Sequence, residues 1–272
     1  MGRTHQVRAG ALLVALSLTA VARAAEVPRI VLDPGHGGAL EGAIAPAGFR
    51  EKKLALQIAF ATRQALEKEL GAKVLLTREA DSSITLAERV AFANRERPDL
   101  FISIHANSMP TTNQRRRAQG IETFFLSAHA SGAEARRTAD LENADSSRSA
   151  ARSDDALQQI LADLTRTEAH ADSSRLAYAV HQAVIASTAA TNRGVQQAPF
   201  YVLMGIEVPA ILVEVGFISH PGESRRLRDP KYQETIASGI ANGVRDFVRY
   251  LQAREGPQAH LQRTSTAIGT SR

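Results

Sequence analysis

The sequence predicts an α/β fold: a single domain with a mixed, largely parallel central sheet that is flanked by helices and carries one helical insertion. Apolar strands alternate with amphipathic helices along most of the chain, which is the pattern of this fold class. Several strands are short, uninterrupted apolar runs, as expected where helices cover both faces of a sheet. With 272 residues, the chain is long enough for one large core.

The domain begins with an apolar strand over 29–33 that runs into a glycine-rich turn. A helix is expected over 51–70, because apolar residues recur on one of its faces and Gly71 follows its last turn. The run from 73 to 77 predicts a second strand.

The next pair of elements is a helix followed by a strand. The helix is expected over 85–96, where Thr85 and Glu88 form a capping box at its start and Pro98 follows its end. The continuous apolar run 100–104 then predicts a strand that is buried on both faces.

The second half of the domain continues the alternation of strands and helices. The expected strands are 120–126, 199–204 and 209–215, and the expected helices are the alanine-rich 175–190 and the amphipathic 232–251. These elements complete the predicted α/β sandwich.

A long segment over 129–173 interrupts this pattern, and we expect it to be an insertion, since it exceeds ordinary loop lengths. Its first half, 131–147, has helix-forming composition but only Leu141 as a large apolar residue, which predicts little anchoring to a core. Its second half places an apolar stripe at helical spacing, formed by Leu157, Ile160, Leu161 and Leu164.

The two ends of the chain lie outside the predicted domain of residues 25–251. Residues 1–24 are expected to be a secretory signal peptide: Arg3 and Arg8 precede an apolar stretch too short for a membrane anchor, and 22–24 suit a cleavage site. The polar tail over 252–272 lacks periodicity and is expected to be disordered. Export to the periplasm in soluble form follows from these expectations.

Composition excludes several functional classes. The formal charge of +5 falls to +2 without the signal peptide, because residues 1–24 hold three of the 33 basic residues and none of the 28 acidic ones. This balance gives no support to nucleic-acid binding. The chain has no cysteine, which excludes thiolate metal sites and cysteine nucleophiles.

Two histidines and two glutamates lie at, or just beyond, the expected carboxyl ends of strands, and they match a catalytic zinc site with a spare carboxylate. His36 lies in the turn Asp-Pro-Gly-His-Gly-Gly, and His105 ends an apolar strand. Glu214 lies between two valines in an apolar strand, where an unpaired carboxylate costs roughly several kcal/mol. Glu51 opens a helix, and its position alone is equally explained by the helix dipole.

Together these motifs resemble the zinc-dependent N-acetylmuramoyl-L-alanine amidases of the amidase-3 family, including the periplasmic cell-division amidases. The resemblance spans about residues 28–251. Further stretches support it in order and spacing: Leu-Thr-Arg at 76–78, Ser-Ile-Thr-Leu-Ala-Glu-Arg-Val at 83–90, Ala-Asn at 93–94, Asn-Arg-Gly-Val at 192–195, Phe-Tyr-Val-Leu at 200–203 and Gly-Phe-Ile-Ser at 216–219.

The resemblance implies a role for each of the four residues. His36, Glu51 and His105 would be zinc ligands, and Glu214 the catalytic carboxylate that accepts a proton from water and passes it to the leaving amine. Zinc would polarise the scissile carbonyl and lower the pKa of the attacking water. The bond cleaved would join N-acetylmuramic acid to L-alanine of peptidoglycan, which releases stem peptides for wall remodelling and daughter-cell separation.

Three further residues are candidates for substrate contact or for support of the ligands. They are Arg78, Asn107 and Glu122, and an ordinary turn or surface position explains each of them equally well. Two other functions are less consistent with the sequence. A zinc peptidase acting on wall peptides has usual motifs that do not suit this sequence, and a non-enzymatic wall-binding module would be expected to have lost a ligand or Glu214.

The insertion is a candidate regulator. The division amidases that the chain resembles carry, at this point, a helix that lies over the active site and donates a glutamate to the zinc. Glu142 matches that glutamate, so we expect it to occupy the open zinc position and hold the enzyme inactive. A solvated charged helix is the alternative. The resemblance also implies an activator with a LytM-type domain, which would dock on the apolar stripe of Leu157, Ile160, Leu161 and Leu164.

Overall fold

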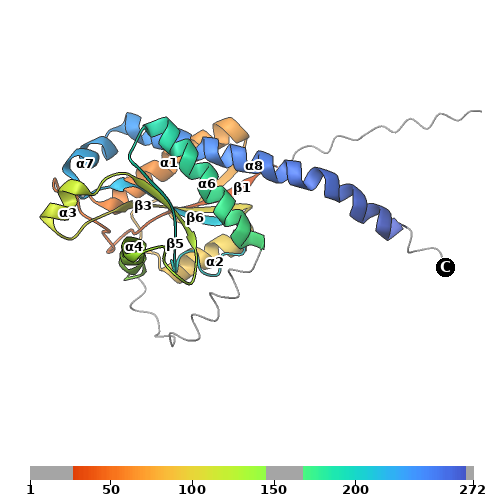
Figure 1. Cartoon of the computed structure of the whole chain (residues 1–272), viewed down its shortest axis with the longest axis horizontal. Helices are drawn as coiled ribbons and strands as arrows, with labels where there is room; N and C mark the ends of the chain where they lie inside the picture. Colours follow the sequence, from red (N-terminus) through yellow and green to blue (C-terminus); the bar gives the residue numbers. More distant parts are fainter. Residues whose placement is uncertain (1–26, 145–167, 268–272) are drawn as a thin grey trace, which may run out of the picture.

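The computed structural model describes residues 27–144 and 168–267, and it confirms the predicted α/β class (Figure 1). Its centre is one six-stranded sheet with the strand order β2-β1-β3-β6-β4-β5. The strands are β1 Arg29–Pro34, β2 Lys73–Leu76, β3 Leu100–Asn107, β4 Ile121–Leu126, β5 Asn192–Ala198 and β6 Ala210–Phe217.

The sheet is mixed and largely parallel, as predicted. All described neighbouring pairs are parallel except β4 and β6, which run antiparallel. The parallel strands β1, β3 and β6 therefore present their carboxyl ends at one edge of the sheet. In the registers of β6, Glu214 lies beside His105 of β3 and Glu122 of β4, so three predicted site residues share one row.

Helices cover both faces of the sheet (Figure 1). The long helices α1, α6 and α8 pack on one face and α2 and α4 on the other, while α3 and α7 are short connectors. Their bounds are α1 Glu51–Leu70, α2 Leu86–Glu96, α3 Thr112–Arg117, α4 Ala133–Asn143, α6 Glu168–Thr188, α7 Pro221–Leu227 and α8 Pro230–Ala267.

Each central strand contributes to two hydrophobic cores, because neighbouring side chains point to opposite faces. In β1, Ile30 and Leu32 pack with α1, α6 and α8, whereas Val31 packs on the opposite face. In β3, Ile102 packs on the face of α1, α6 and α8, and Phe101 packs on the opposite face. All eight residues of this strand are buried. This confirms the prediction of a strand that is covered on both faces.

The predicted helix signals also hold. Gly71 adopts a left-handed φ of 62° and donates its N–H to the carbonyl of Glu67, which ends α1. Thr85 and Glu88 form the expected capping box at the start of α2. These local interactions fix the ends of both helices that flank β2.

Two predicted boundaries were wrong. The edge strand is β5, not 199–204, which forms a turn instead. Pro199 lacks an N–H for a strand ladder, and the apolar side chains of Phe200 and Leu203 are buried from the turn itself. Helix α8 continues beyond the predicted end at 251 to Ala267 and projects past the rest of the domain (Figure 1).

Part of the predicted insertion is visible on both sides of 145–167. Its first half forms α4, and α6 begins at Glu168, seven residues before the expected start. The apolar stripe of Leu157, Ile160, Leu161 and Leu164 lies outside the described residues, as do the expected signal peptide and the last five residues. Within the described part of the chain, no helix is long and apolar enough to cross a membrane.

Candidate active site

Four side chains converge at the carboxyl edge of the sheet: His36, Glu51, His105 and Glu142. One potential ligand atom from each lies within 4.8 Å of the other three. Glu51 Oε1 is 3.0 Å from His36 Nε2 and 3.1 Å from His105 Nδ1, while Glu142 Oε2 is 3.2 and 2.8 Å from the same two nitrogens. The structure thus brings together all three predicted ligands and the predicted regulatory glutamate.

This donor set fits a zinc ion. Imidazole nitrogens and carboxylate oxygens are its usual ligands, and four of them suit its tetrahedral geometry. The two carboxylates also need a positive charge between them. Burial alone would lower the pKa of His105, but the facing carboxylates of Glu142 and Glu51 raise that pKa to about 10. The cluster therefore attracts positive charge strongly.

The turn after β1 holds His36 in an unusual backbone conformation. His36 has a φ of 58°, in the left-handed region that costs a non-glycine residue about 1–2 kcal/mol. Two buried arginines stabilise this turn through its carbonyls: Arg89 donates to Pro34 and His36, at 2.8 and 2.6 Å, and Arg78 donates to Pro34 and Gly35, at 3.0 and 2.7 Å. Arg89 also pairs with the fully buried Asp33 at 2.6 Å.

Glu51 is fixed by backbone donors as well as by the histidines. Its Oε1 accepts the N–H of Ala106 at 3.0 Å, and its Oε2 accepts the N–H of Ala43 at 2.8 Å. Burial would raise the pKa of Glu51, but the charges of His36 and His105 lower it below its usual value. Glu51 is therefore a preorganised carboxylate, and its role is not limited to a favourable place in the helix dipole.

Glu214 is the most isolated acid of the site. Its side chain is fully buried, and neither carboxylate oxygen has a hydrogen-bond partner among the described residues. Burial raises the pKa of Glu214 well above its usual value, and the nearby carboxylate of Glu142 raises it further. A buried acid with unused oxygens beside a metal-competent cluster is the arrangement expected of a proton acceptor and donor.

Helix α4 brings Glu142 into the cluster, although its composition predicted weak anchoring. Small side chains bury its inner face: Ala135, Thr138 and Ala139 are almost fully inaccessible. Asn143 then fixes the end of the helix, donating to the carbonyl of Pro199 and accepting from the N–H of Tyr201, both at 2.8 Å. Close approach of small residues and polar contacts replace the large apolar residues that are missing from α4.

The three remaining candidates are all buried, so the alternative of an ordinary surface position does not hold for them. Arg78 supports the His36 turn from behind. Asn107 donates to Glu122 Oε2 at 3.0 Å and to Thr138 Oγ1 at 3.2 Å, which links the row of site residues to α4. Burial raises the pKa of Glu122, whereas the neighbouring Arg193 lowers it.

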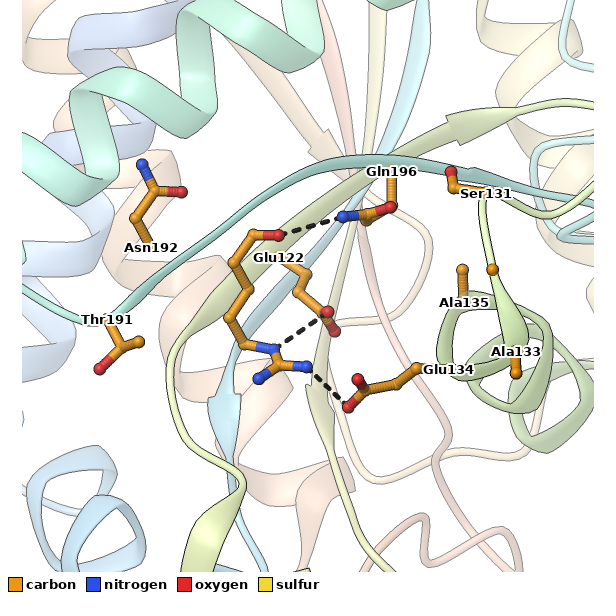
Figure 2. Close-up of a pocket in the computed structure, with 10 residues that line it drawn as sticks. Glu122, Ser131, Ala133, Glu134, Ala135, Thr191, Asn192 and Gln196 are labelled. Atoms are coloured by element: carbon orange, nitrogen blue, oxygen red, sulfur yellow. Dashed lines mark hydrogen bonds and ion pairs between the residues drawn. The ribbon is translucent and has the colours of Figure 1, made fainter.

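Sequence reasoning missed the individual importance of Asp33, Arg89, Asn143 and Arg193. Arg193 donates from Nε to Glu122 at 3.0 Å and pairs through Nη2 with Glu134 of α4 at 2.7 Å. Arg193, Glu122 and Glu134 line a pocket between β4, β5 and α4, and Figure 2 shows Glu122 and Glu134 in it. Asp33, Arg89 and Arg193 belong to motifs noted in the sequence, but no spacing rule connects them with their partners.

An α/β sheet that presents two histidines, a carboxylate ligand and a separate buried acid at one edge defines a candidate metallohydrolase. Comparison with known proteins specifies the family. Residues 30–246 match the family profile Amidase_3, described as N-acetylmuramoyl-L-alanine amidase. The chain belongs to this amidase-3 family.

Individual relatives agree with this assignment. N-acetylmuramoyl-L-alanine amidase AmiA of Escherichia coli K12 is 37% identical over 238 residues, which cover 86% of this chain and 80% of AmiA. AmiC of Escherichia coli O6:H1 is 36% identical over 221 residues, covering 80% of this chain and 52% of AmiC. The crystal structure of an N-acetylmuramoyl-L-alanine amidase from Clostridium difficile 630 has a TM-score of 0.64 and 27% identity, and covers 82% of this chain and 97% of that one.

Proposed function

We propose that this chain is an exported zinc amidase that cleaves the bond between N-acetylmuramic acid and L-alanine in peptidoglycan, and that α4 holds it inactive until a partner displaces the helix. Family membership supports the amidase chemistry. The position of Glu142, with one oxygen 2.8 Å from His105 and 3.2 Å from His36, is the observation that supports the regulation.

In the proposed reaction, His36, Glu51 and His105 would hold the metal. A zinc ion there would supply Lewis-acid polarisation of the scissile carbonyl and a lowered pKa for the attacking water. Glu214 would accept a proton from the attacking water, because neither of its carboxylate oxygens has a hydrogen-bond partner among the described residues and a raised pKa makes its carboxylate a stronger base. The same carboxyl group then protonates the amine of L-alanine as it leaves.

Helix α4 opposes this reaction in two ways. The Glu142 carboxylate, next to both histidines, would compete with water for the metal. The body of the helix covers the carboxyl ends of the strands, fixed by its buried small residues and by Asn143. The metal ligands can therefore be in place while α4 keeps the substrate out of the site.

Release of α4 requires a partner, and we propose that this partner is an activator with a LytM-type domain. The apolar stripe of Leu157, Ile160, Leu161 and Leu164 in the same insertion would be its docking element, since helices bind grooves through such spacing. The proposed periplasmic location rests on residues 1–24 and their signal-peptide pattern. Release of stem peptides would then contribute to wall remodelling and daughter-cell separation.

Replacement of Glu142 tests the closed state. The variant Glu142→Ala removes one charged contact to two histidines, worth about 1.5–3 kcal/mol, so basal release of stem peptides should rise about 10- to 100-fold without any partner. Asp140→Ala is the matched control, because Asp140 lies on the exposed face of the same helix, 61% accessible and paired with Arg136. Products are identified by mass after digestion of purified peptidoglycan. Equal basal activity of parent and Glu142→Ala proteins would rule out autoinhibition.

A further inference from the structure

A pocket of about 420 Å³ lies between the sheet and the first turn of α4. Its walls come from β4, from the start of β5 and from the first turn of α4, as the positions of Glu122, Asn192 and Glu134 in Figure 2 show. Glu122 also lies directly across from Glu214 in the sheet. Glu122 therefore belongs both to the lining of this pocket and to the row of residues that holds Glu214 and His105.

Arg193 connects the fixed wall of this pocket with the movable one. Its Nε donates to Glu122, which is almost fully buried and also bound by Asn107. Its Nη2 pairs with Glu134, whose side chain is 41% exposed. The guanidinium also lies over the ring of Phe217, 5.0 Å from its centroid. A planar guanidinium held in this way is suited to bind a further carboxylate through its remaining N–H groups.

The two carboxylates that α4 places on the active face are eight residues apart. Glu134 and Glu142 are thus separated by about 12 Å along the helix axis. An extended peptide spans the same distance with about three to four residues, at roughly 3.3 Å each. A peptide whose scissile bond lies at the metal site could therefore place a carboxylate against Arg193.

We infer that Arg193 is a substrate-binding residue for a free carboxylate of the stem peptide, and that Glu134 occupies its place in the closed state. Helix α4 is then an internal competitor at two points, with Glu142 at the metal ligands and Glu134 at Arg193. Displacement of α4 exposes the second edge of the guanidinium, while Glu122 keeps the first edge fixed. This inference rests on the proposed function, because it requires a peptide substrate and a helix that leaves.

The test compares two soluble muramyl peptides, one with free stem-peptide carboxylates and one with the same carboxylates amidated. Both are cleaved by purified Glu142→Ala protein, in which the proposed block at the metal ligands is removed. We expect the KM to be about 10- to 100-fold lower for the free carboxylates, the range of a charged hydrogen bond worth about 1.5–3 kcal/mol. The kcat should differ little, since this contact lies away from the reacting bond.

Variants of Arg193 then test whether this residue causes the preference for free carboxylates. Adding Arg193→Gln should abolish the preference, so that this variant shows the same KM for the peptide with free carboxylates and for the amidated peptide. Arg193→Lys should keep part of the preference, since it retains the charge but not the planar fork. A Glu142→Ala protein that cleaves both peptides with equal KM would overturn the inference, whether or not the Arg193 variants fold. Release of stem peptide from neither substrate would instead contradict the proposed function.

Discussion

Replacement of Asn143 separates the closure of the site from the chemistry of the metal ligands. Asn143 ends α4 and contributes no atom to the cluster, yet it holds the helix to the 199–201 turn with two hydrogen bonds of 2.8 Å each. In Asn143→Ala these two contacts are lost while Glu142 is unchanged. Alanine has a higher helix propensity than asparagine, so any loss of α4 docking in this variant would come from the lost contacts and not from a less stable helix.

The expected magnitude follows from these two contacts. A hydrogen bond between uncharged groups contributes about 0.5–1.5 kcal/mol net, so both together stabilise the docked helix by about 2 kcal/mol. Since 1.4 kcal/mol is a factor of ten, the ratio of open to closed protein should rise about 30-fold. While the open form is a minor population, basal amidase activity should rise by the same factor.

The assay measures release of stem peptides from purified peptidoglycan, together with hydrogen exchange of the α4 amides. Both should increase in Asn143→Ala, and neither should change in the control Asp140→Ala. The double variant Asn143→Ala, Glu142→Ala should increase basal activity by less than the product of the two single fold-increases, because both substitutions destabilise the same closed state. Faster exchange of α4 without any gain in activity would refute the view that the docked helix limits turnover.

The fold and the metal-competent cluster were predictable from sequence because their signals are local. A continuous apolar strand that ends in His105, or a valine-flanked Glu214, marks an unusual residue in a buried element. Parallel strands then bring their carboxyl ends to one edge of the sheet, which places such residues together. Glu51 is the exception: the residue pattern alone left its role open, and the family resemblance supplied it.

The anchoring of α4 and the position of the edge strand could not be predicted in this way. Helix α4 docks through Ala135 and Ala139, small residues that score as weakly apolar but allow close approach. Its polar anchor, Asn143, depends on a turn more than 50 residues away in sequence. The edge strand β5 is only partly buried, so its polar residues carry no alternating apolar pattern. Such features depend on tertiary contacts rather than on local composition.

Two further predictions concern the reacting acid and the support of the His36 turn. Glu214→Gln should abolish peptide release but retain zinc, measured by metal analysis of the purified protein, because no ligand is removed; loss of zinc would show that Glu214 holds the metal. Asp33→Asn should destabilise the protein by about 3–5 kcal/mol at pH 7 in urea unfolding, since it leaves the buried Arg89 without its counter-charge. Burial opposes ionisation of Asp33, but Arg89, Thr77 and Ser103 together lower its pKa below the usual value of 3.8. The ionised carboxylate therefore contributes fully to the free energy of unfolding above about pH 3.8. This contribution is lost as the pH falls through the lowered pKa of the folded state. The difference between the two proteins should therefore narrow below about pH 3.8, and a difference that stays constant between pH 7 and about pH 3 would show that Asp33 does not act through its charge.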